Sequence, residues 1–268
     1  TDYSVFRIDS ANMIYLPQRF FGFLNVIPRV GYRATYYSET MKELTTVTTG
    51  LTTQVTTTVD ASGATNTSYS SVLSTNTQTS RVKGPAELRS RYEFGAETSL
   101  RAFRTWDDEF GGWRHVVEPY ANYTFVPESN LLPDNIYQFD TIDELSKEHW
   151  LKFGIRNKLQ TKVNGTPHNL IDFDIYTRYL FERGDRSSSL DNINLEFKTW
   201  PAEGVTLFLD GVYDTEASTL AAFNTRLGFS TSDFYEISLE HRYTSDGSNL
   251  LNTFLSLSPN RFWTFELY

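Results

Sequence analysis

The sequence contains no cysteine, only four histidines and no long hydrophobic run. Without cysteine there can be no disulfides, thiolate nucleophiles or cysteine-ligated zinc sites. A transmembrane helix needs roughly 18 or more consecutive apolar residues, and the chain, with a mean hydropathy of −0.41, offers no such stretch. The net charge of −9 argues against nucleic-acid binding, because the proteins that bind nucleic acid present basic surfaces.

The chain does contain a repeated alternation of apolar and polar residues. Leu151, Phe153 and Ile155 alternate with Lys152 and Arg156. The segment 171–181 repeats the pattern, and 15% of all residues are aromatic. A period of two places the two sets on opposite faces of a β-sheet. In a membrane barrel the apolar set faces lipid and the charged set faces a wet lumen.

We therefore predict an all-β fold, a transmembrane antiparallel up-and-down β-barrel or part of one. A soluble β-sandwich is the alternative, but long strands with charged inner faces would leave it without an adequate core. The pattern predicts about twelve strands, at residues 3–16, 21–38, 86–106, 113–126, 147–163, 168–182, 190–200, 203–213, 219–231, 233–245, 249–259 and 261–268.

The connections between these strands differ in length and composition. Residues 45–81 are rich in serine and threonine, cannot bury a core and are predicted to be an external loop. Part of that segment can extend as a hairpin, since threonine and valine favour strands. External loops are also predicted at 107–112, 183–189, 214–218 and 245–249. Short turns predict the periplasmic rim at 201–204, 232–233 and 259–260, and we place 127–146 on that rim as well.

Several blocks in the first part of the chain resemble a known family. The segment from Trp113 to Pro127 is followed by Pro133, then by Phe139 and Asp140, and then by a strand that runs to Leu159. With the proline-containing stretch 26–37, their order and spacing resemble the C-terminal barrel region of the LPS-assembly protein family, LptD, also called organic solvent tolerance protein. The matching blocks span roughly residues 3–163.

The resemblance implies a non-enzymatic function, the insertion of lipopolysaccharide into the outer leaflet of the bacterial outer membrane. It implies a polar lumen, a lateral seam, a plug lipoprotein, periplasmic bridge proteins and no cofactor. The family's N-terminal periplasmic domain, its disulfides and about half of its barrel strands have no counterpart in residues 1–268. From this, and from a start at Thr1 without a signal peptide, we expect the C-terminal part of a longer polypeptide.

Alternation along the strands predicts which side chains face the lumen. These are Arg29, Arg33, Arg91, Glu93, Glu97, Arg101, Lys152, Arg156, Lys158, Asp172, Asp174, Arg178, Glu196, Lys198, Glu236, Glu240 and Arg242. Their mixed signs indicate a hydrated wall braced by ion pairs rather than a basic funnel. The last strand, with Trp263, Phe265 and Leu267 on one face, is the candidate seam strand.

Two other functional classes fit parts of the pattern. A passive porin would have the same alternation and the same charged lumen, and only the family blocks and the abrupt start speak against it. An outer-membrane hydrolase needs a histidine beside a nucleophile or carboxylate. Glu240 and His241 are adjacent in a strand and so face opposite ways. No catalytic, metal-binding or cofactor-binding residue is predicted.

Overall fold

The structure is a computed structural model that describes residues 4–108, 111–163, 165–231 and 234–267. Within these ranges the chain is all-β, and its one helical element is the 3-10 turn η1 (Pro133–Asn135). A search of the same residues finds no helix with the length and apolar character needed to cross a membrane.

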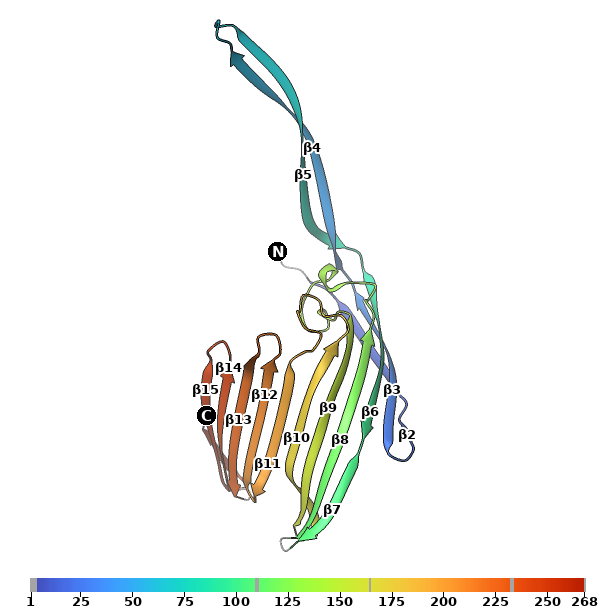
Figure 1. Cartoon of the computed structure of the whole chain (residues 1–268), viewed down its shortest axis with the longest axis vertical. Helices are drawn as coiled ribbons and strands as arrows, with labels where there is room; N and C mark the ends of the chain where they lie inside the picture. The colour runs from blue at the N-terminus through green and yellow to red at the C-terminus, as the bar shows by residue number, and fades with distance from the viewer. Residues whose placement is uncertain (1–3, 109–110, 164, 232–233, 268) are drawn as a thin grey trace. The chain divides into compact units, whose positions relative to one another are not determined.

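The strands follow one another along almost the whole described chain (Figure 1). They are β1 (Arg7–Tyr15), β2 (Gln18–Phe20), β3 (Leu24–Tyr37), β4 (Thr40–Val59), β5 (Thr65–Gly84), β6 (Glu87–Leu100), β7 (Ala102–Asp108), β8 (Gly111–Val126), β9 (Glu148–Val163), β10 (Thr166–Leu180), β11 (Ile193–Ala202), β12 (Val205–Asp214), β13 (Thr219–Thr231), β14 (Tyr235–Thr244), β15 (Asn249–Asn260) and β16 (Trp263–Leu267).

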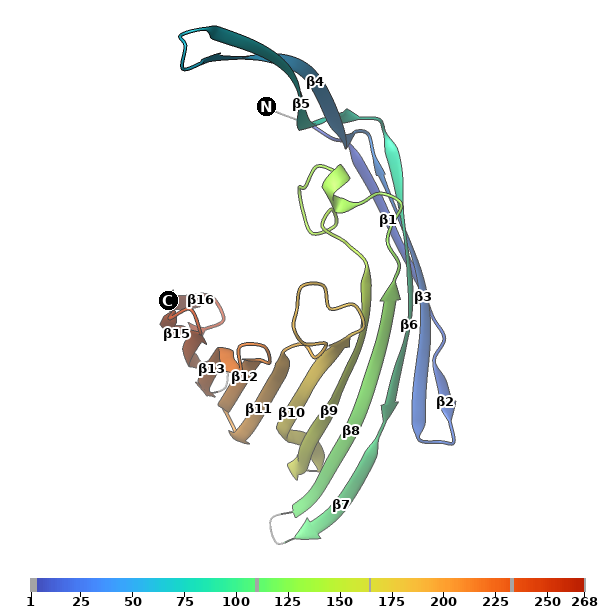
Figure 2. The ribbon, with the colours of Figure 1, turned by 45° about the horizontal axis from the view of Figure 1, so that its top comes forward.

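One 14-stranded sheet contains all of these strands except β4 and β5. Its order is β1-β3-β6-β8-β9-β10-β11-β12-β13-β14-β15-β16, with β2 beside β3 and β7 beside β8. From β8 onward each strand pairs with the next along the chain, and Figure 2 shows β8 to β13 as one continuous layer. The predicted all-β, antiparallel up-and-down fold is confirmed. The sheet has 14 strands rather than about twelve, and among the described residues it is open, with β1 and β16 at its two ends.

The chain divides into two compact units. We call residues 1–11, 33–91 and 128–146 the ribbon unit, because it contains the β4–β5 hairpin, and residues 12–32, 92–127 and 147–268 the sheet unit.

Every predicted strand range overlaps an observed strand, although one range is interrupted. The range 86–106 is divided at Arg101, which separates β6 from β7. Both strands pair with β8, so the break is a local irregularity beside a continuous neighbour. Alternation could not predict the break, because the apolar pattern continues on both sides of it.

Strand direction corrects the side of the sheet predicted for two connections. β7 ends, and β8 begins, at the same end of the sheet as the end of β11 and the start of β12, because neighbouring strands are antiparallel. Grouping 107–112 with 183–189 was therefore wrong, and residues 109–110 of that range lie outside the described residues. β8 and β10 end at the same end of the sheet, so the chain leaves β8 at the end where it leaves β10 and not at the end of the short turns. Length was the only sequence cue, and length does not determine the side. The predicted turn at 232–233 lies outside the described residues.

Residues 45–81 form a regular two-stranded ribbon, the hairpin that the threonine and valine content allowed for part of this segment. Whether the segment is external stays a prediction. β4 and β5 pair in unbroken register from Thr40↔Gly84 to Val59↔Thr65. At the tip, Asp60 Oδ1 accepts hydrogen bonds from the Ser62 and Ala64 amides at 2.9 and 3.0 Å. Gly63 supplies a φ of +83°, in the left-handed region that glycine adopts without steric cost. The β-branched threonines and valines favour the extended backbone on either side of this turn.

The core of the ribbon unit forms where segment 128–146 packs against β3. Tyr37, Leu131 and Ile136 are its buried apolar cluster. Beside it, the fully buried Asp143 carboxylate accepts hydrogen bonds from the Tyr37 hydroxyl at 2.8 Å and the Phe139 amide at 2.9 Å. Arg7 adds a 2.8 Å ion pair to the same carboxylate.

A second buried charge holds the other end of segment 128–146. The Arg89 side chain, 2% exposed, donates hydrogen bonds to the Ile142 and Asp143 carbonyls at 3.0 and 3.3 Å and also to the Leu145 carbonyl. Guanidinium donors aimed at several carbonyls fix the backbone of a segment that has no strand partners of its own.

The docking of segment 128–146 is expected to weaken in acid. The Arg7 guanidinium lowers the pKa of Asp140 to about 2. For Asp143, burial acts to raise the pKa, but hydrogen bonds from the Phe139 amide, Tyr37 and Arg7 outweigh it and the pKa is lowered. A lowered folded-state pKa stabilises docking above the ordinary value of about 4 and loses that contribution as the pH falls toward 2.

Hydrogen exchange measures this effect. The protection factor of the Phe139 amide should stay level from pH 8 to 5 and decline below about pH 4. A protection factor that rises on acidification would contradict the assignment.

Candidate functional site

The charged side chains of the sheet unit gather on one face of β8, β9 and β10. Register places Glu118 opposite Arg156, and Arg156 opposite Asp174. Arg101 extends this row, because its guanidinium lies 2.6 Å from the Glu118 carboxylate. Arg156 then spans Glu118 at 3.4 Å and Asp174 at 3.5 Å. Charges of alternating sign thus cross three strands.

Neighbouring pairs continue this polar face along the same strands. Lys158 bonds Asp172 at 2.8 Å, and Arg178 pairs with Asp191 in the loop after β10. Lys152 Nζ lies 3.5 Å from the centre of the Tyr176 ring, a cation–π contact.

Aromatic hydroxyls and stacked cations tie the row together. The Tyr120 hydroxyl donates to both Asp174 oxygens at 3.1 Å, and the Arg156 guanidinium lies 4.0 Å from the Tyr120 ring centre. Glycine at 154 leaves room for this arrangement. A Cβ atom there would lie 2.8 Å from the Tyr120 hydroxyl and 2.6 Å from the Ile175 carbonyl oxygen.

Arg29 anchors the polar face at its β3 side. Its guanidinium pairs with Glu93 at 2.9 Å and donates to Asn122 at 2.8 Å and Thr124 at 2.5 Å. A Cβ at Gly95 would lie 2.6 Å from the Arg29 Cζ atom and 2.7 Å from the Tyr123 carbonyl oxygen. The carbonyl is part of the backbone, so this close approach requires glycine.

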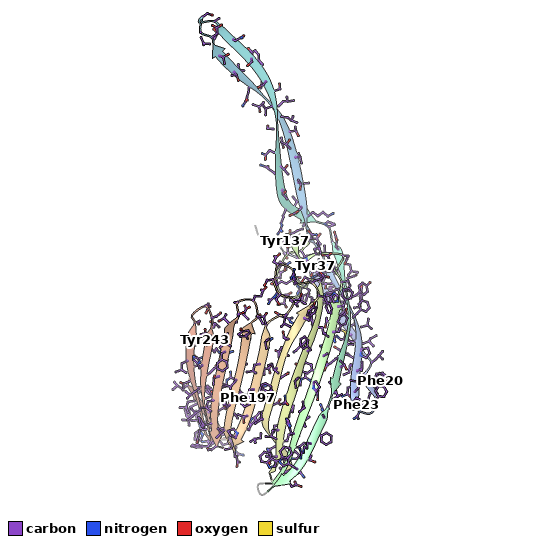
Figure 3. All side chains as sticks on the ribbon, viewed as in Figure 1. Phe20, Phe23, Tyr37, Tyr137, Phe197 and Tyr243 are labelled. Atoms are coloured by element: carbon purple, nitrogen blue, oxygen red, sulfur yellow. The ribbon has the colours of Figure 1, made fainter. Side chains whose placement is uncertain are left out.

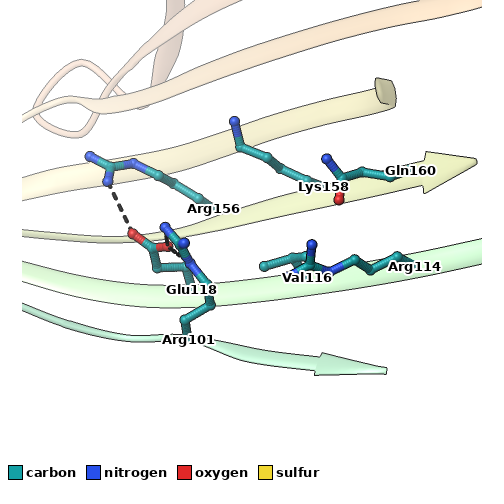
Figure 4. Close-up of a pocket in the computed structure, with 7 residues that line it drawn as sticks. All are labelled: Arg101, Arg114, Val116, Glu118, Arg156, Lys158 and Gln160. Carbon is teal, nitrogen blue, oxygen red and sulfur yellow. Dashed lines mark hydrogen bonds and ion pairs between the residues drawn. The ribbon is translucent and has the colours of Figure 1, made fainter. Parts of the chain in front are cut away.

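A small hollow opens over β8 and β9 (Figure 4). It has a volume of about 210 Å³ and is lined by Arg101, Arg114, Val116, Glu118, Arg156, Lys158 and Gln160. Figure 4 shows Glu118 reaching the Arg156 guanidinium across the strands. The cationic groups outnumber the single carboxylate in this lining, so the hollow favours an anionic group.

The polar face becomes more acidic toward β14. A hollow of about 510 Å³ over β11 to β14 contains the carboxylates Glu196, Asp210 and Glu240, together with Lys198 and Arg226. Arg226 pairs with Glu240 at 2.9 Å. The two signs are therefore mixed over the whole face.

The opposite face of the same strands is apolar and exposed. Phe153 and Ile155 on β9 are 41% and 44% exposed, and Tyr179 and Phe181 are 42% and 48% exposed. The apolar face continues onto β11 with Phe197, labelled in Figure 3, whose register partner on β10 is Phe173. Large apolar side chains gathered in one exposed patch mark a surface that contacts another molecule or a membrane.

An aromatic cluster lies at one end of this apolar face. His149 stacks on Phe181 at 4.3 Å between ring centres and meets Phe125 edge-on at 5.0 Å. The Tyr123 hydroxyl lies 3.0 Å from His149 Nε2. These contacts gather four aromatic side chains from β8, β9 and the residue after β10 at one end of the face.

The predicted lumen residues of the sheet unit fall where alternation placed them. Cross-strand register and contacts put them on one face, together with partners that the prediction did not include; the predicted members are Arg29, Glu93, Glu97, Arg101, Lys152, Arg156, Lys158, Asp172, Asp174, Arg178, Glu196, Lys198, Glu236, Glu240 and Arg242. Whether this face lines a lumen stays a prediction.

Two predicted residues lie in the ribbon unit instead. Arg33 pairs with Asp9 at 2.7 Å, and Arg91 donates to the Ser146 carbonyl at 3.4 Å. The candidate seam residues Trp263, Phe265 and Leu267 lie on β16, an end strand, with 63%, 58% and 66% of their surface exposed.

Sequence reasoning missed several members of the polar face. They include Glu118, Tyr120, Asn122, Asp210, Asn224 and Arg226. The first three lie at alternate positions of β8, and β8 pairs with the strand that carries Lys152. Applying the same alternation to β8 would have found them.

The histidine and acidic side chains of the described residues are spread over strands and loops rather than gathered into a metal-binding group. No group of three or more histidine or acidic side chains is placed there to hold a metal. His241 bonds Asn249 at 3.2 Å, whereas Glu240 on the other face bonds Arg226 and Arg242.

Removing the shared cation of the row should destabilise the sheet unit. Arg156→Leu leaves Asp174 and Glu118 without their common partner, and we expect a loss of about 1–2 kcal/mol because all three groups are partly solvated. Arg156→Lys keeps the positive charge but lacks the planar guanidinium that contacts both carboxylates, so we expect a loss of stability between those of wild type and Arg156→Leu. The urea midpoint of the protein refolded in detergent measures both. Equal midpoints for wild type and Arg156→Leu would show that the row contributes nothing.

Comparison of the sequence with protein-family models gives no match, and a search of curated protein sequences also gives none.

Proposed function

We propose that this chain is part of the wall of an outer-membrane β-barrel that carries lipopolysaccharide to the outer leaflet. The observation that supports a barrel wall is the two-sided sheet, which has paired charges on one face and exposed aromatic and aliphatic side chains on the other. In a bilayer the apolar face contacts lipid and the charged face contacts water. An all-β chain without apolar helices is compatible with that location.

The free sides of β1 and β16 support a wall that is completed by further strands. In hydrocarbon each unsatisfied backbone group costs several kcal/mol. The two end strands of this sheet therefore need pairing partners in the membrane. One side of the lateral seam would be β16, whose Trp263, Phe265 and Leu267 would face lipid.

The lipopolysaccharide step rests on the ordered blocks between residues 3 and 163 and on the chemistry of the polar face. A phosphorylated sugar head group needs a hydrated path with cations, and the hollow lined by Arg101, Arg114 and Arg156 offers them. The acyl chains need an apolar exit, which the seam would provide.

A passive channel is the second candidate, and the mixed charge supports it. Carboxylates and cations alternate over β8 to β14, which suits small solutes of either sign. A channel would conduct ions in planar bilayers and would not contact lipopolysaccharide from its polar face.

Paired cysteine variants test the wall itself. Lys198 and Phe197 are adjacent on β11 and face opposite ways. In intact outer-membrane vesicles Lys198→Cys should react with a water-soluble maleimide, and Phe197→Cys should react only after detergent is added. The chain has no other cysteine, so the label reports one position. Equal labelling of both in intact membranes contradicts the wall.

A photoreactive residue tests the cargo. p-Benzoylphenylalanine in place of Tyr176, on the polar face, should give a lipopolysaccharide adduct in living cells that disappears when lipopolysaccharide synthesis is blocked. The same replacement of Ile175, on the apolar face, reports bilayer lipid and serves as the control. If Tyr176 gives no such adduct while the cysteine pair behaves as a wall, the passive channel is the better assignment.

A further inference from the structure

The β4–β5 ribbon has two faces of different chemistry. In its register, odd-numbered residues of both strands share one face. That face carries nearly all the large apolar side chains of the ribbon beyond Leu44, namely Val47, Leu51, Val55, Val59, Tyr69 and Leu73. The even face carries Leu44 and Val72 among serine, threonine, asparagine and glutamine. We call the odd face the apolar stripe.

The stripe is exposed and regularly spaced. Leu51 and its register partner Leu73 are 73% and 62% exposed, and Val55 and its partner Tyr69 are 56% and 73% exposed. Its β4 members recur at every fourth residue, a spacing of about 13 Å. Threonine occupies most of the positions between them, so methyl groups fill the gaps.

Nothing else in the ribbon shields or solubilises this stripe. Within the described residues β4 and β5 pair only with each other. Between Leu44 and Ser80 the only charged residue is Asp60, at the tip. A two-stranded hairpin without a third strand or a covering layer is marginally stable in water, and edges without charges invite association.

We propose that the ribbon dimerises with a second copy of this chain, the two apolar stripes stacking face to face with their tips pointing the same way. A two-fold axis parallel to the ribbons lays β4 of one copy over β5 of its partner. Leu51 then meets Leu73 of the partner subunit, and Val55 meets Tyr69 of the partner subunit. Each large apolar pair faces its own equivalent, as an isologous contact requires.

The area and the charges at the base favour this arrangement. Each strand has 20 residues, so one face measures about 66 Å by 10 Å, or roughly 650 Å². Two stacked faces bury roughly 1,300 Å², which is enough for a specific interface. At the base, Glu43 pairs in register with Arg81 on the same odd face. The parallel stack sets Glu43 over Arg81 of the partner subunit. In an antiparallel stack, Glu43 and Arg81 would instead face the tip half of the partner ribbon, which carries no charged residue on that face.

Cross-linking of the full chain tests the stack, and the absence of native cysteine makes single-cysteine variants unambiguous. Thr57→Cys lies on the apolar stripe, and Thr56→Cys, its neighbour on the even face, is the matched control. With a bismaleimide of two-carbon spacer in detergent solution, most of the Thr57→Cys chain should become a covalent dimer, and the Thr56→Cys chain should form no covalent dimer. Sedimentation should show a dimer for the wild type and loss of that dimer for the double variant Leu51→Lys with Val55→Lys.

Several results would overturn the proposal. A monomeric wild type would indicate another occupant of the stripe, and equal cross-linking of the two cysteine variants would indicate edge-to-edge association. A dimer in which Thr57→Cys does not cross-link would indicate an antiparallel stack. A dimer that survives the two lysines would indicate an interface elsewhere. The cysteine comparison stands even if the lysine variant misfolds. The proposal does not depend on the cargo of the barrel, so its failure leaves the proposed function unchanged.

Discussion

Asp143→Ala should release segment 128–146 from β3. The substitution removes a fully buried carboxylate and leaves the Tyr37 hydroxyl and the Phe139 amide without their acceptor. Arg7 loses one of its two carboxylate partners and keeps Asp140. A buried donor left unsatisfied costs about 1–3 kcal/mol, so the Tyr37 hydroxyl and the Phe139 amide together predict a local cost of about 3 kcal/mol. This is the largest effect we expect, because both donors and the Arg7 ion pair lose the same acceptor at once.

Hydrogen exchange of the Phe139 amide measures the loss directly. A local cost of about 3 kcal/mol lowers its protection factor at least a hundredfold. Asp134→Ala, an exposed position on the same segment, is the control and should leave protection unchanged. Asp143→Asn keeps the shape and one acceptor oxygen, so it should fall between the two. If Asp143→Ala exchanges like wild type, the hydrogen bonds to Asp143 do not hold the segment.

The Tyr37 hydroxyl also connects this carboxylate to the apolar cluster. Tyr37 is 1% exposed and packs with Leu131 and Ile136. Loss of Asp143 therefore removes the polar partner of a core side chain as well as an ion pair. The unsatisfied hydroxyl of Tyr37 accounts for about 1–3 kcal/mol of that local cost.

Gly154→Ala should force β9 and β10 apart in the sheet unit. The added Cβ would lie 2.6 Å from the Ile175 carbonyl oxygen and 2.7 Å from the Tyr176 Cβ, closer than real Cβ contacts. Neither neighbour is the end of a flexible side chain, so the backbone has to move. Overpacking of this kind costs about 1–3 kcal/mol. The same Cβ approaches the Tyr120 hydroxyl at 2.8 Å, so the bond from Tyr120 to Asp174 should weaken as well.

The matched control is Gly211→Ala on β12. There the nearest neighbour of an added Cβ is the edge of the Phe223 ring at 3.3 Å, which can shift. Alanine also gains about 0.5–1 kcal/mol over glycine inside a strand, so this variant should be neutral or slightly stabilised. Urea midpoints of the refolded proteins should drop for Gly154→Ala only. Equal midpoints for the two variants would show that the close approach at Gly154 is relieved without cost.

The sequence by itself determined the strands and their faces. Apolar and polar residues alternate within each strand, and this period of two is a property of a single extended segment. Lys152, Arg156 and Lys158 could therefore be assigned to one face without knowing any neighbour. At 45–81 the composition predicted an external loop with a hairpin in part of it, and only the structure showed that the hairpin pairs over Thr40–Val59 and Thr65–Gly84.

Only the tertiary structure decided which side chains meet. Arg156 bridges Glu118 and Asp174 because β8 and β10 flank β9 in one particular register, and a shift of one residue would place those carboxylates on the other face. Arg7 reaches Asp143 from 136 residues away along the chain. Such contacts depend on register and on the path of the connections, which a local period does not encode. For the same reason the side of the sheet from which 127–146 departs became known only from the direction of β8.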